Sequence, residues 1–209
     1  MAETVLFSIY RGVPGYQYWE DFTIPFDLQL NIISALMHIQ RYPVNSKGQK
    51  TTPVVWESGC LEEVCGSCSM LINGVPKQAC SALVHQLTEG MAERRVTLAP
   101  FTKFPLVRDL MVDRKSMFQN LQKIQAWVEA DGYFDIGFGP TVDPKKQEVA
   151  YLLSTCMTCG CCSESCPQLS HKTRFMGPAP IAQVRLFSIH PTARRKADER
   201  LRLMQQEEG

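Results

Sequence analysis

The 209-residue sequence predicts an α+β protein with two domains, a mixed domain over residues 1–102 and an all-helical domain over residues 103–209. Three observations lead to this prediction. Short apolar runs separated by Gly, Pro and Asn fill much of the first hundred residues, as in a small sheet. Apolar residues at helical spacing prevail in the second hundred. Each half also carries its own cysteine run, and about 100 residues is an ordinary domain size.

The predicted strands of the first domain are short apolar segments, at residues 4–10, 22–26, 53–56, 69–72, 75–78 and 96–99. Asn31 is a predicted N-cap for a helix whose apolar residues follow the helical period and which ends before Pro43. Asn73-Gly74 separates two of the strands and is the dipeptide most typical of a tight hairpin. Strands wrapped over one helix predict a β-grasp arrangement.

The first cysteine run lies in the segment SGCLEEVCGSCSMLINGVPKQAC and has the spacing Cys60-x4-Cys65-x2-Cys68-x11-Cys80. This is the plant-type spacing for a [2Fe–2S] cluster held by four thiolates. Soft thiolate ligands select iron–sulfur clusters or zinc, so a zinc site and two disulfides are the alternatives. Zinc sites usually have paired Cys-x2-Cys knuckles, and the x4 gap therefore favours the cluster. The mixed domain is predicted to be a β-grasp plant-type ferredoxin domain.

The second cysteine run reads TCMTCGCCSESCP and has the spacing Cys156-x2-Cys159-x2-Cys162-x3-Cys166, followed by Pro167. This is the bacterial ferredoxin run for a cubane cluster, whose fourth cysteine typically serves a different cluster. Cys161 is off the ligand spacing and is predicted to be a small buried hydrophobe. The nine cysteines are then all assigned, and they leave the ligand sets of the second and third clusters incomplete.

The second domain is predicted to be a helical ferredoxin-like domain, joined to the first by a connector near residues 99–105. One long amphipathic helix is predicted over residues 107–128, followed by a loop over residues 131–144 rich in Gly, Asp and Pro. Its remaining helices are predicted at residues 148–154, 181–190 and 192–209, the second of these after a stiff break at residues 177–180.

Composition excludes several classes of protein. The chain has 22 basic and 21 acidic side chains and a formal net charge of +1, so its charge gives no case for a nucleic-acid partner. No apolar run approaches the ~18 residues that a membrane span needs, and the start of the chain lacks the apolar core of a signal peptide. The cysteines at cluster spacing indicate free thiolates, not disulfides, and therefore a reducing compartment. The expected location is the cytoplasm or the cytoplasmic face of a membrane.

The sequence resembles the iron–sulfur subunit of succinate dehydrogenase or fumarate reductase over essentially its whole length. The resemblance is carried by NIISALMHIQRYPVN, CLEEVCGSCSMLING, CMTCGCCSESCP, FMGPAP and IAQVRLF. It implies an electron-transfer subunit with [2Fe–2S], [4Fe–4S] and [3Fe–4S] clusters and no catalytic residue of its own. Such a subunit relays single electrons between the FAD of a flavoprotein subunit and a quinone at membrane anchor cytochrome b subunits.

The resemblance also assigns residues. It implies that the [2Fe–2S] cluster is held by Cys60, Cys65, Cys68 and Cys80. It implies that three ligands of the [4Fe–4S] cluster are Cys156, Cys159 and Cys162. Cys166 would be the first ligand of the [3Fe–4S] cluster, and Pro167 would line the quinone pocket.

The sequence departs from the family pattern in two places. Family members carry a further cysteine motif beyond the position where this chain ends, at Gly209, so we expect a truncated piece of a longer protein. The tryptophan that many ubiquinone-using members carry soon after Pro167 is missing, which favours the menaquinone-type bacterial form, peripheral at the cytoplasmic face of the cell membrane. Two alternatives stay open, an electron carrier for another flavoenzyme and a non-redox zinc module.

Overall fold

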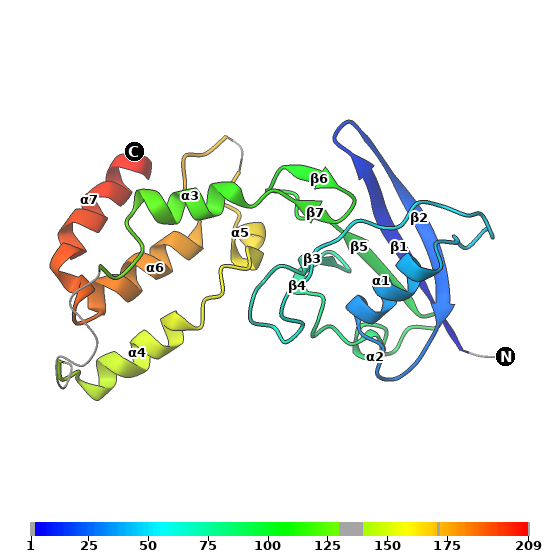
Figure 1. Cartoon of the computed structure of the whole chain (residues 1–209), viewed down its shortest axis with the longest axis horizontal. Coiled ribbons are helices and arrows are strands. Elements are labelled where there is room, and N and C mark those ends of the chain that lie inside the picture. Colours follow the sequence, from blue (N-terminus) through cyan, green and yellow to red (C-terminus); the bar gives the residue numbers. More distant parts are fainter. Residues whose placement is uncertain (1–2, 130–139, 171, 209) are drawn as a thin grey trace. The chain divides into compact units, whose positions relative to one another are not determined.

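The computed structural model describes residues 3–129, 140–170 and 172–208 (Figure 1). The chain divides into two compact units, the first made of Met1–Asp113 and Cys159–Ser165 and the second of Arg114–Thr158 and Cys166–Gly209. The predicted α+β class is confirmed, since the first unit carries a sheet and the second is built from helices. The prediction placed one boundary, at residue 102, whereas the chain passes between these units three times.

The first unit is built on a five-stranded mixed sheet with the order β2-β1-β5-β3-β4. Its strands are β1 (Thr4–Val13), β2 (Tyr16–Pro25), β3 (Ser69–Ile72), β4 (Val75–Gln78) and β5 (Arg95–Ala99). The central pair β1 and β5 is parallel, and the pairs β1–β2, β3–β4 and β3–β5 are antiparallel. Five of the six predicted strands are therefore confirmed, with β1 and β2 longer than predicted.

Helix α1 (Ile32–Arg41) packs its apolar face into the core of this sheet. Asn31 is the N-cap, and its side-chain oxygen accepts a hydrogen bond from the Ser34 backbone N–H at 2.8 Å, as the sequence predicted. Ile32 and Leu36 are fully buried together with Phe7 of β1. A shorter helix, α2 (Val84–Leu87), follows β4.

The β3–β4 hairpin confirms the Asn73-Gly74 prediction. Both turn residues are left-handed, with φ of 50° and 76°, as a two-residue turn between antiparallel strands requires. The pairing continues beyond the strands, because the Ala79 backbone N–H donates to the Cys68 carbonyl at 3.2 Å. The hairpin therefore carries Cys80 back to the cysteine loop.

The predicted strand over residues 53–56 is wrong. This segment is extended and buries Val54, but it is not part of the sheet. Its backbone bonds to the side chains of Arg11 and Asp109 and to the Leu110 N–H, which donates to the Val55 carbonyl at 3.1 Å. Arg11 Nη2 donates to the Thr52 carbonyl at 3.0 Å, and the Val55 N–H donates to Asp109 Oδ2 at 2.8 Å. Since these partners are distant in sequence, an apolar run alone could not reveal them.

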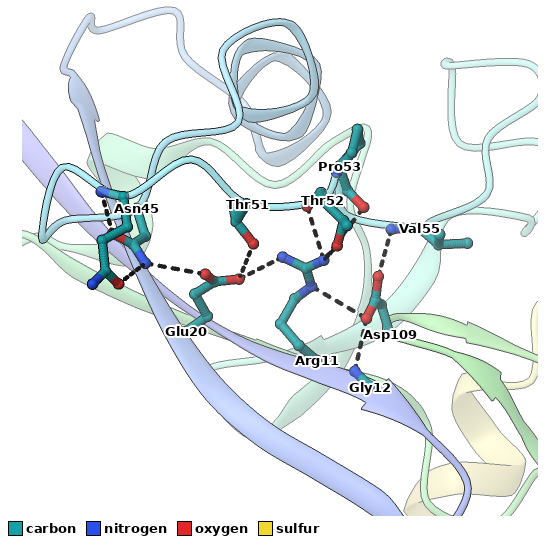
Figure 2. Close-up of polar contacts among 10 residues, drawn as sticks. Arg11, Gly12, Glu20, Asn45, Thr51, Thr52, Pro53, Val55 and Asp109 are labelled. Carbon is teal, nitrogen blue, oxygen red and sulfur yellow. Dashed lines mark hydrogen bonds and ion pairs between the residues drawn. The ribbon is translucent and has the colours of Figure 1, made fainter.

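A buried arginine organises this part of the first unit (Figure 2). Arg11 is 1% exposed and forms ion pairs with Glu20 at 2.6 Å and with Asp109 at 3.2 Å. Asp109 Oδ1 also accepts from the Gly12 N–H at 2.7 Å. The network thus joins β1, β2 and the segment before the first cysteine run to the chain around Asp109.

The predicted long helix over residues 107–128 is also wrong. Its first part is a short hairpin of β6 (Leu106–Arg108) and β7 (Met111–Val112), and only α3 (Lys115–Lys123) is helical. Asp109 is left-handed at φ 50°, a conformation that its bonds to Gly12 and Val55 hold in place. Gln125, left-handed at φ 52°, follows the end of α3.

The second unit contains α3, α4 (Pro144–Ser154), α6 (Pro178–Ile189), the 3-10 turn Ala193–Lys196 and α7 (Ala197–Glu208). The predicted break before α6 is wrong, because Pro178 and Pro180 lie in the first turn of the helix, where proline costs no hydrogen bond. Most of the predicted loop over residues 131–144 lies outside the described residues. In the described part of the chain, no helix combines the length and the apolar character that a membrane crossing requires.

Candidate functional site

The first cysteine run forms a loop whose backbone turns toward sulfur. Leu61, Glu63 and Gly66 are left-handed, with φ of 61°, 61° and 71°. As a result, the N–H groups of Val64 and Cys65 both donate to Cys60 Sγ at 3.2 Å, and the N–H of Glu62 donates to it at 3.5 Å. Such N–H groups stabilise a thiolate and are the hydrogen bonds that tune a cluster held by it.

Cys65 receives similar contacts. Its Sγ accepts from the N–H of Cys60 at 3.4 Å and of Ser67 at 3.5 Å, and it lies 3.4 Å from the Ser67 hydroxyl oxygen. The hydroxyl of Ser67, followed by these N–H groups, lowers the pKa of Cys65 from 9.0 to about 6. Cys65 is therefore largely thiolate at neutral pH even though its side chain is exposed.

Cys68 and Cys80 form a second pair, at the base of the β3–β4 hairpin. Burial, with a further contribution from the adjacent Cys80 thiol, raises the pKa of Cys68 to about 11. The structure thus gathers the four predicted cysteines of this run in one unit as two pairs, Cys60 with Cys65 and Cys68 with Cys80. In residues 3–129, 140–170 and 172–208, no three His, Cys, Asp or Glu side chains form a group that could hold a single metal ion.

The first run fits an iron–sulfur group on the chemistry of its donors. All nine cysteines lie within the described residues and none of them is in a disulfide, so the two-disulfide alternative is not realised. A Cβ at Gly59 would lie 3.0 Å from Cys65 Sγ, so a glycine there leaves room for the sulfur. Thiolates surrounded by backbone N–H groups on a tight loop are suited to an anionic iron–sulfur core.

The second run is divided between the two units. Cys156 follows α4, and its N–H donates to the Leu153 carbonyl at 3.3 Å. Cys166 and Pro167 belong with Cys156 to the second unit, where the Leu169 N–H donates to the Cys166 carbonyl at 3.3 Å. Cys159 and Cys162 lie in the first unit, Cys162 on the short helix α5 (Cys161–Ser165).

Cys159 and Cys161 interact through their side chains. A hydrogen bond from the Cys161 thiol lowers the pKa of Cys159 to about 6, and the same contact together with burial raises the pKa of Cys161. Cys161 is half-buried, where the sequence predicted a buried hydrophobe. It supports the sulfur of its neighbour, a role that its position off the ligand spacing did not indicate.

Glu164 is a functional residue that sequence reasoning missed. Its carboxylate is 9% exposed and accepts from the Thr102 N–H at 2.9 Å, the Thr102 hydroxyl at 2.6 Å and the Lys103 N–H at 3.0 Å. It fastens the second cysteine segment to the chain after β5. A glutamate between two cysteines gives no periodicity or spacing signal, so the sequence could not have revealed this contact.

Comparison with known proteins identifies the class of site. Residues 6–119 match a family described as a 2Fe-2S iron-sulfur cluster binding domain. The succinate dehydrogenase iron-sulfur subunit of Bacillus subtilis (strain 168) is 54% identical over 209 residues, which cover 99% of this chain and 81% of that protein. The fumarate reductase iron-sulfur subunit of Wolinella succinogenes is 31% identical over 152 residues, which cover 72% of this chain and 62% of that protein.

A solved structure agrees on the fold. A chain of the Mycobacterium smegmatis Sdh1 complex in the apo form superposes with a TM-score of 0.72 at 20% sequence identity, covering 96% of this chain and 82% of that chain. Sheet, cysteine loop and family match together define an iron–sulfur redox protein. The chain belongs to the family of iron–sulfur subunits of succinate dehydrogenase and fumarate reductase, the electron-transfer subunits of these enzyme complexes.

Proposed function

We propose that this chain relays single electrons between the FAD of a flavoprotein subunit and a quinone bound at membrane anchor cytochrome b subunits. The observation that supports this most directly is the loop of the first cysteine run, where N–H groups converge on Cys60 and Cys65 in a chain of this family. With its thiolates bound to a cluster, such a loop would hold charge on sulfur without offering a free nucleophile to a substrate.

We assign Cys60, Cys65, Cys68 and Cys80 as the ligands of the [2Fe–2S] cluster. The support is their plant-type spacing and their placement in one unit as two pairs of sulfur atoms. The hairpin turn at Asn73-Gly74 brings Cys80 back beside Cys68, which a linear motif cannot do by itself.

We assign Cys156, Cys159 and Cys162 to the [4Fe–4S] cluster and Cys166 to the [3Fe–4S] cluster. The support is the bacterial ferredoxin spacing, whose fourth cysteine serves another cluster. Both clusters need ligands in addition to these four, and Cys161 is the one cysteine of the sequence that is left unassigned. The β-grasp ferredoxin domain at residues 1–102 and the helical ferredoxin-like domain at residues 103–209 stay predictions at these boundaries.

The partners follow from the same proposal. The relatives are named as subunits of succinate dehydrogenase and fumarate reductase, so a flavoprotein subunit would supply the substrate chemistry. We propose that the complex lies at the cytoplasmic face of the bacterial membrane and that Pro167 borders the quinone site. Menaquinone is the favoured quinone, because Gln168, Leu169 and Ser170 follow Pro167 where many ubiquinone-using members carry a tryptophan.

The bound clusters supply one-electron redox chemistry, and the residues of this chain control it. N–H groups from Val64, Cys65 and Ser67 offset negative charge on sulfur. Burial of Cys68 would limit the access of water to a cluster held by this residue. The Arg11 network holds residues 52–55, the segment that leads into the loop.

Anaerobic reconstitution with iron and sulfide tests the proposal. We expect a reducible [2Fe–2S] signal in electron paramagnetic resonance (EPR). Cys60→Ala should abolish this signal, and the matched variant Cys161→Ala should keep it because Cys161 is outside the assigned ligand set. Stoichiometric zinc, with no paramagnetic signal on reduction, would contradict the proposal. The quinone assignment is tested in the membrane complex by comparing the rates at which menaquinone and ubiquinone analogues are reduced.

A further inference from the structure

The loop of the first cysteine run touches the second run at a glycine. Gly66 stands between Cys65 and Cys68, and a Cβ built on it would lie 2.6 Å from Cys159 Cα and 2.7 Å from Cys159 Cβ. Carbon atoms in contact are normally about 3.5–4.0 Å apart, so any side chain at residue 66 would push the two loops apart by about 1 Å. Gly66 and Cys159 both lie within the first unit.

Cys159 is held at this contact by other parts of the same unit. The next residue, Gly160, packs against the rings of Phe101 and Phe104. A Cβ built on Gly160 would lie 3.3 Å from Phe104 Cζ and 3.4 Å from Phe101 Cε2. Further along, Glu164 accepts three hydrogen bonds from Thr102 and Lys103. Because the segment is anchored in this way, it cannot move freely to make room for a side chain at residue 66.

We propose that Gly66 is a positioning residue that sets the separation of the two cluster-binding loops and so the rate of electron transfer between them. The inference rests on the proposed ligand assignments of Cys65, Cys68 and Cys159. In this proposal one electron leaves the cluster held by Cys65 and Cys68, which is oxidised by one electron. The same electron reduces the cluster held by Cys159, and the backbone contact at Gly66 would be the short path between the two clusters.

Gly48 provides a matched control. Its φ of +76° is close to the +71° of Gly66, so alanine meets the same backbone strain at both positions. A Cβ at Gly48 would have no atom within 4 Å, whereas a Cβ at Gly66 meets Cys159. The difference between Gly66→Ala and Gly48→Ala therefore isolates the contact with Cys159.

The contact is tested first in the cluster-free chain, by urea unfolding. Gly66→Ala should reduce the folding equilibrium constant about tenfold more than Gly48→Ala does, as overpacking does in a tight contact. Part of this loss should disappear when Gly66→Ala is made in a Cys159→Gly background, since contacting residues give non-additive effects. Equal losses in the two backgrounds, or equal losses for the two glycine variants, would overturn the proposal.

The electron path is tested in the assembled complex. With both clusters reduced, the [2Fe–2S] signal of Gly66→Ala should saturate at lower microwave power than that of the wild type, because its spin relaxes through the neighbouring cluster less effectively. Gly48→Ala should match the wild type. Unchanged saturation in Gly66→Ala overturns the inference about separation. A wild-type chain that gives no [2Fe–2S] signal is a different result, since it contradicts the proposed function and not the Gly66 contact.

Discussion

The two cysteine runs present sulfur in different ways. In the first run, left-handed residues at positions 61, 63 and 66 turn N–H groups onto Cys60 and Cys65 within one short loop. In the second run, Cys159 and Cys162 belong to one compact unit and Cys156 and Cys166 to the other. Local conformation shapes the loop around Cys60 and Cys65, whereas tertiary contacts such as those of Glu164 hold the segment that carries Cys159 and Cys162.

This difference shows how far a motif specifies a site. A loop stabilised by its own backbone bonds keeps its shape when distant parts of the chain change. In a run that is divided between two units, the position of each cysteine depends on the contacts that hold its segment in its own unit. Substitutions that weaken distant contacts should therefore affect the two runs unequally, and the following variants measure that inequality.

The largest effect on stability is expected from Arg11→Met. This substitution tests how strongly the unit that carries the first run depends on contacts outside the cysteine loop. The substitution leaves Glu20 and Asp109 as buried carboxylates without their partner, a change that typically lowers the free energy of unfolding by about 3–5 kcal/mol. Urea unfolding of the cluster-free chain measures it. Arg95→Met is the control, because Arg95 is 56% exposed in its ion pair with Asp21 and should lose less than about 1 kcal/mol. Similar losses for both variants would show that the buried network stabilises the chain no more than an exposed ion pair does.

Glu164→Ala comes next and addresses the second run. It removes the acceptor of three hydrogen bonds at a buried position, which should lower the free energy of unfolding by about 1–3 kcal/mol. Glu148→Ala, at an exposed position on α4, is the control and should change little. Hydrogen exchange should show faster opening of residues 159–165 and no change in residues 60–64, which precede the contact of Gly66 with Cys159. Faster exchange in both segments would mean that the two runs are not supported separately.

The smallest effect is on thiol chemistry, where the runs reach the same pKa by different causes. Ser67→Ala removes the largest cause that lowers the pKa of Cys65, so this pKa should rise from about 6 toward 9.0. Alkylation of Cys65 at pH 7 in the cluster-free chain should then slow by about three- to tenfold, because the thiolate is the reactive form. Cys159, whose pKa is lowered by Cys161, should react at an unchanged rate in Ser67→Ala. In Cys161→Ala the alkylation of Cys159 should slow, and that of Cys65 should stay unchanged. Peptide mass spectrometry reads both sites together.

The same pKa values give the sign of the pH dependence. Because the pKa of Cys65 is lowered, its contribution to the stability of the cluster-free chain is present above pH 9 and is lost as pH falls through about 6. The raised pKa of Cys68 acts in the other direction, with a contribution that is present below pH 9 and lost as pH rises toward 11. Since Cys65 is exposed, we expect its contribution to be the smaller.

The sequence was sufficient where the controlling contacts are local. Asn31 caps α1 through Ser34, three residues away, and Asn73-Gly74 closes its hairpin with two left-handed residues. Both features follow from the conformational preferences of the residues involved. The first cysteine run is of the same kind, since its spacing predicts a loop and the structure shows N–H groups converging on sulfur within it.

The sequence was insufficient where distant side chains decide the backbone. Val54 and Val55 have the composition of a strand, but hydrogen bonds of this segment go to the side chains of Arg11 and Asp109 and to the Leu110 N–H. Residues 107–111 have helical spacing, but Asp109 bonds to Gly12 and Val55 and closes a hairpin. Glu164 shows the same limit, because its partners lie more than sixty residues earlier in the chain.

The interleaved order of the units has a consequence for biosynthesis. The ribosome completes β5 at Ala99 well before it makes Cys159–Ser165, the segment that packs onto Gly66, Phe101 and Phe104. Since nascent domains fold from the N-terminus as they emerge, the sheet can form while this segment is still in the exit tunnel. The first unit would then receive its last piece after synthesis has passed through part of the second. Until that moment the contact between Gly66 and Cys159 cannot form, so the first loop lacks this support while the chain is being made.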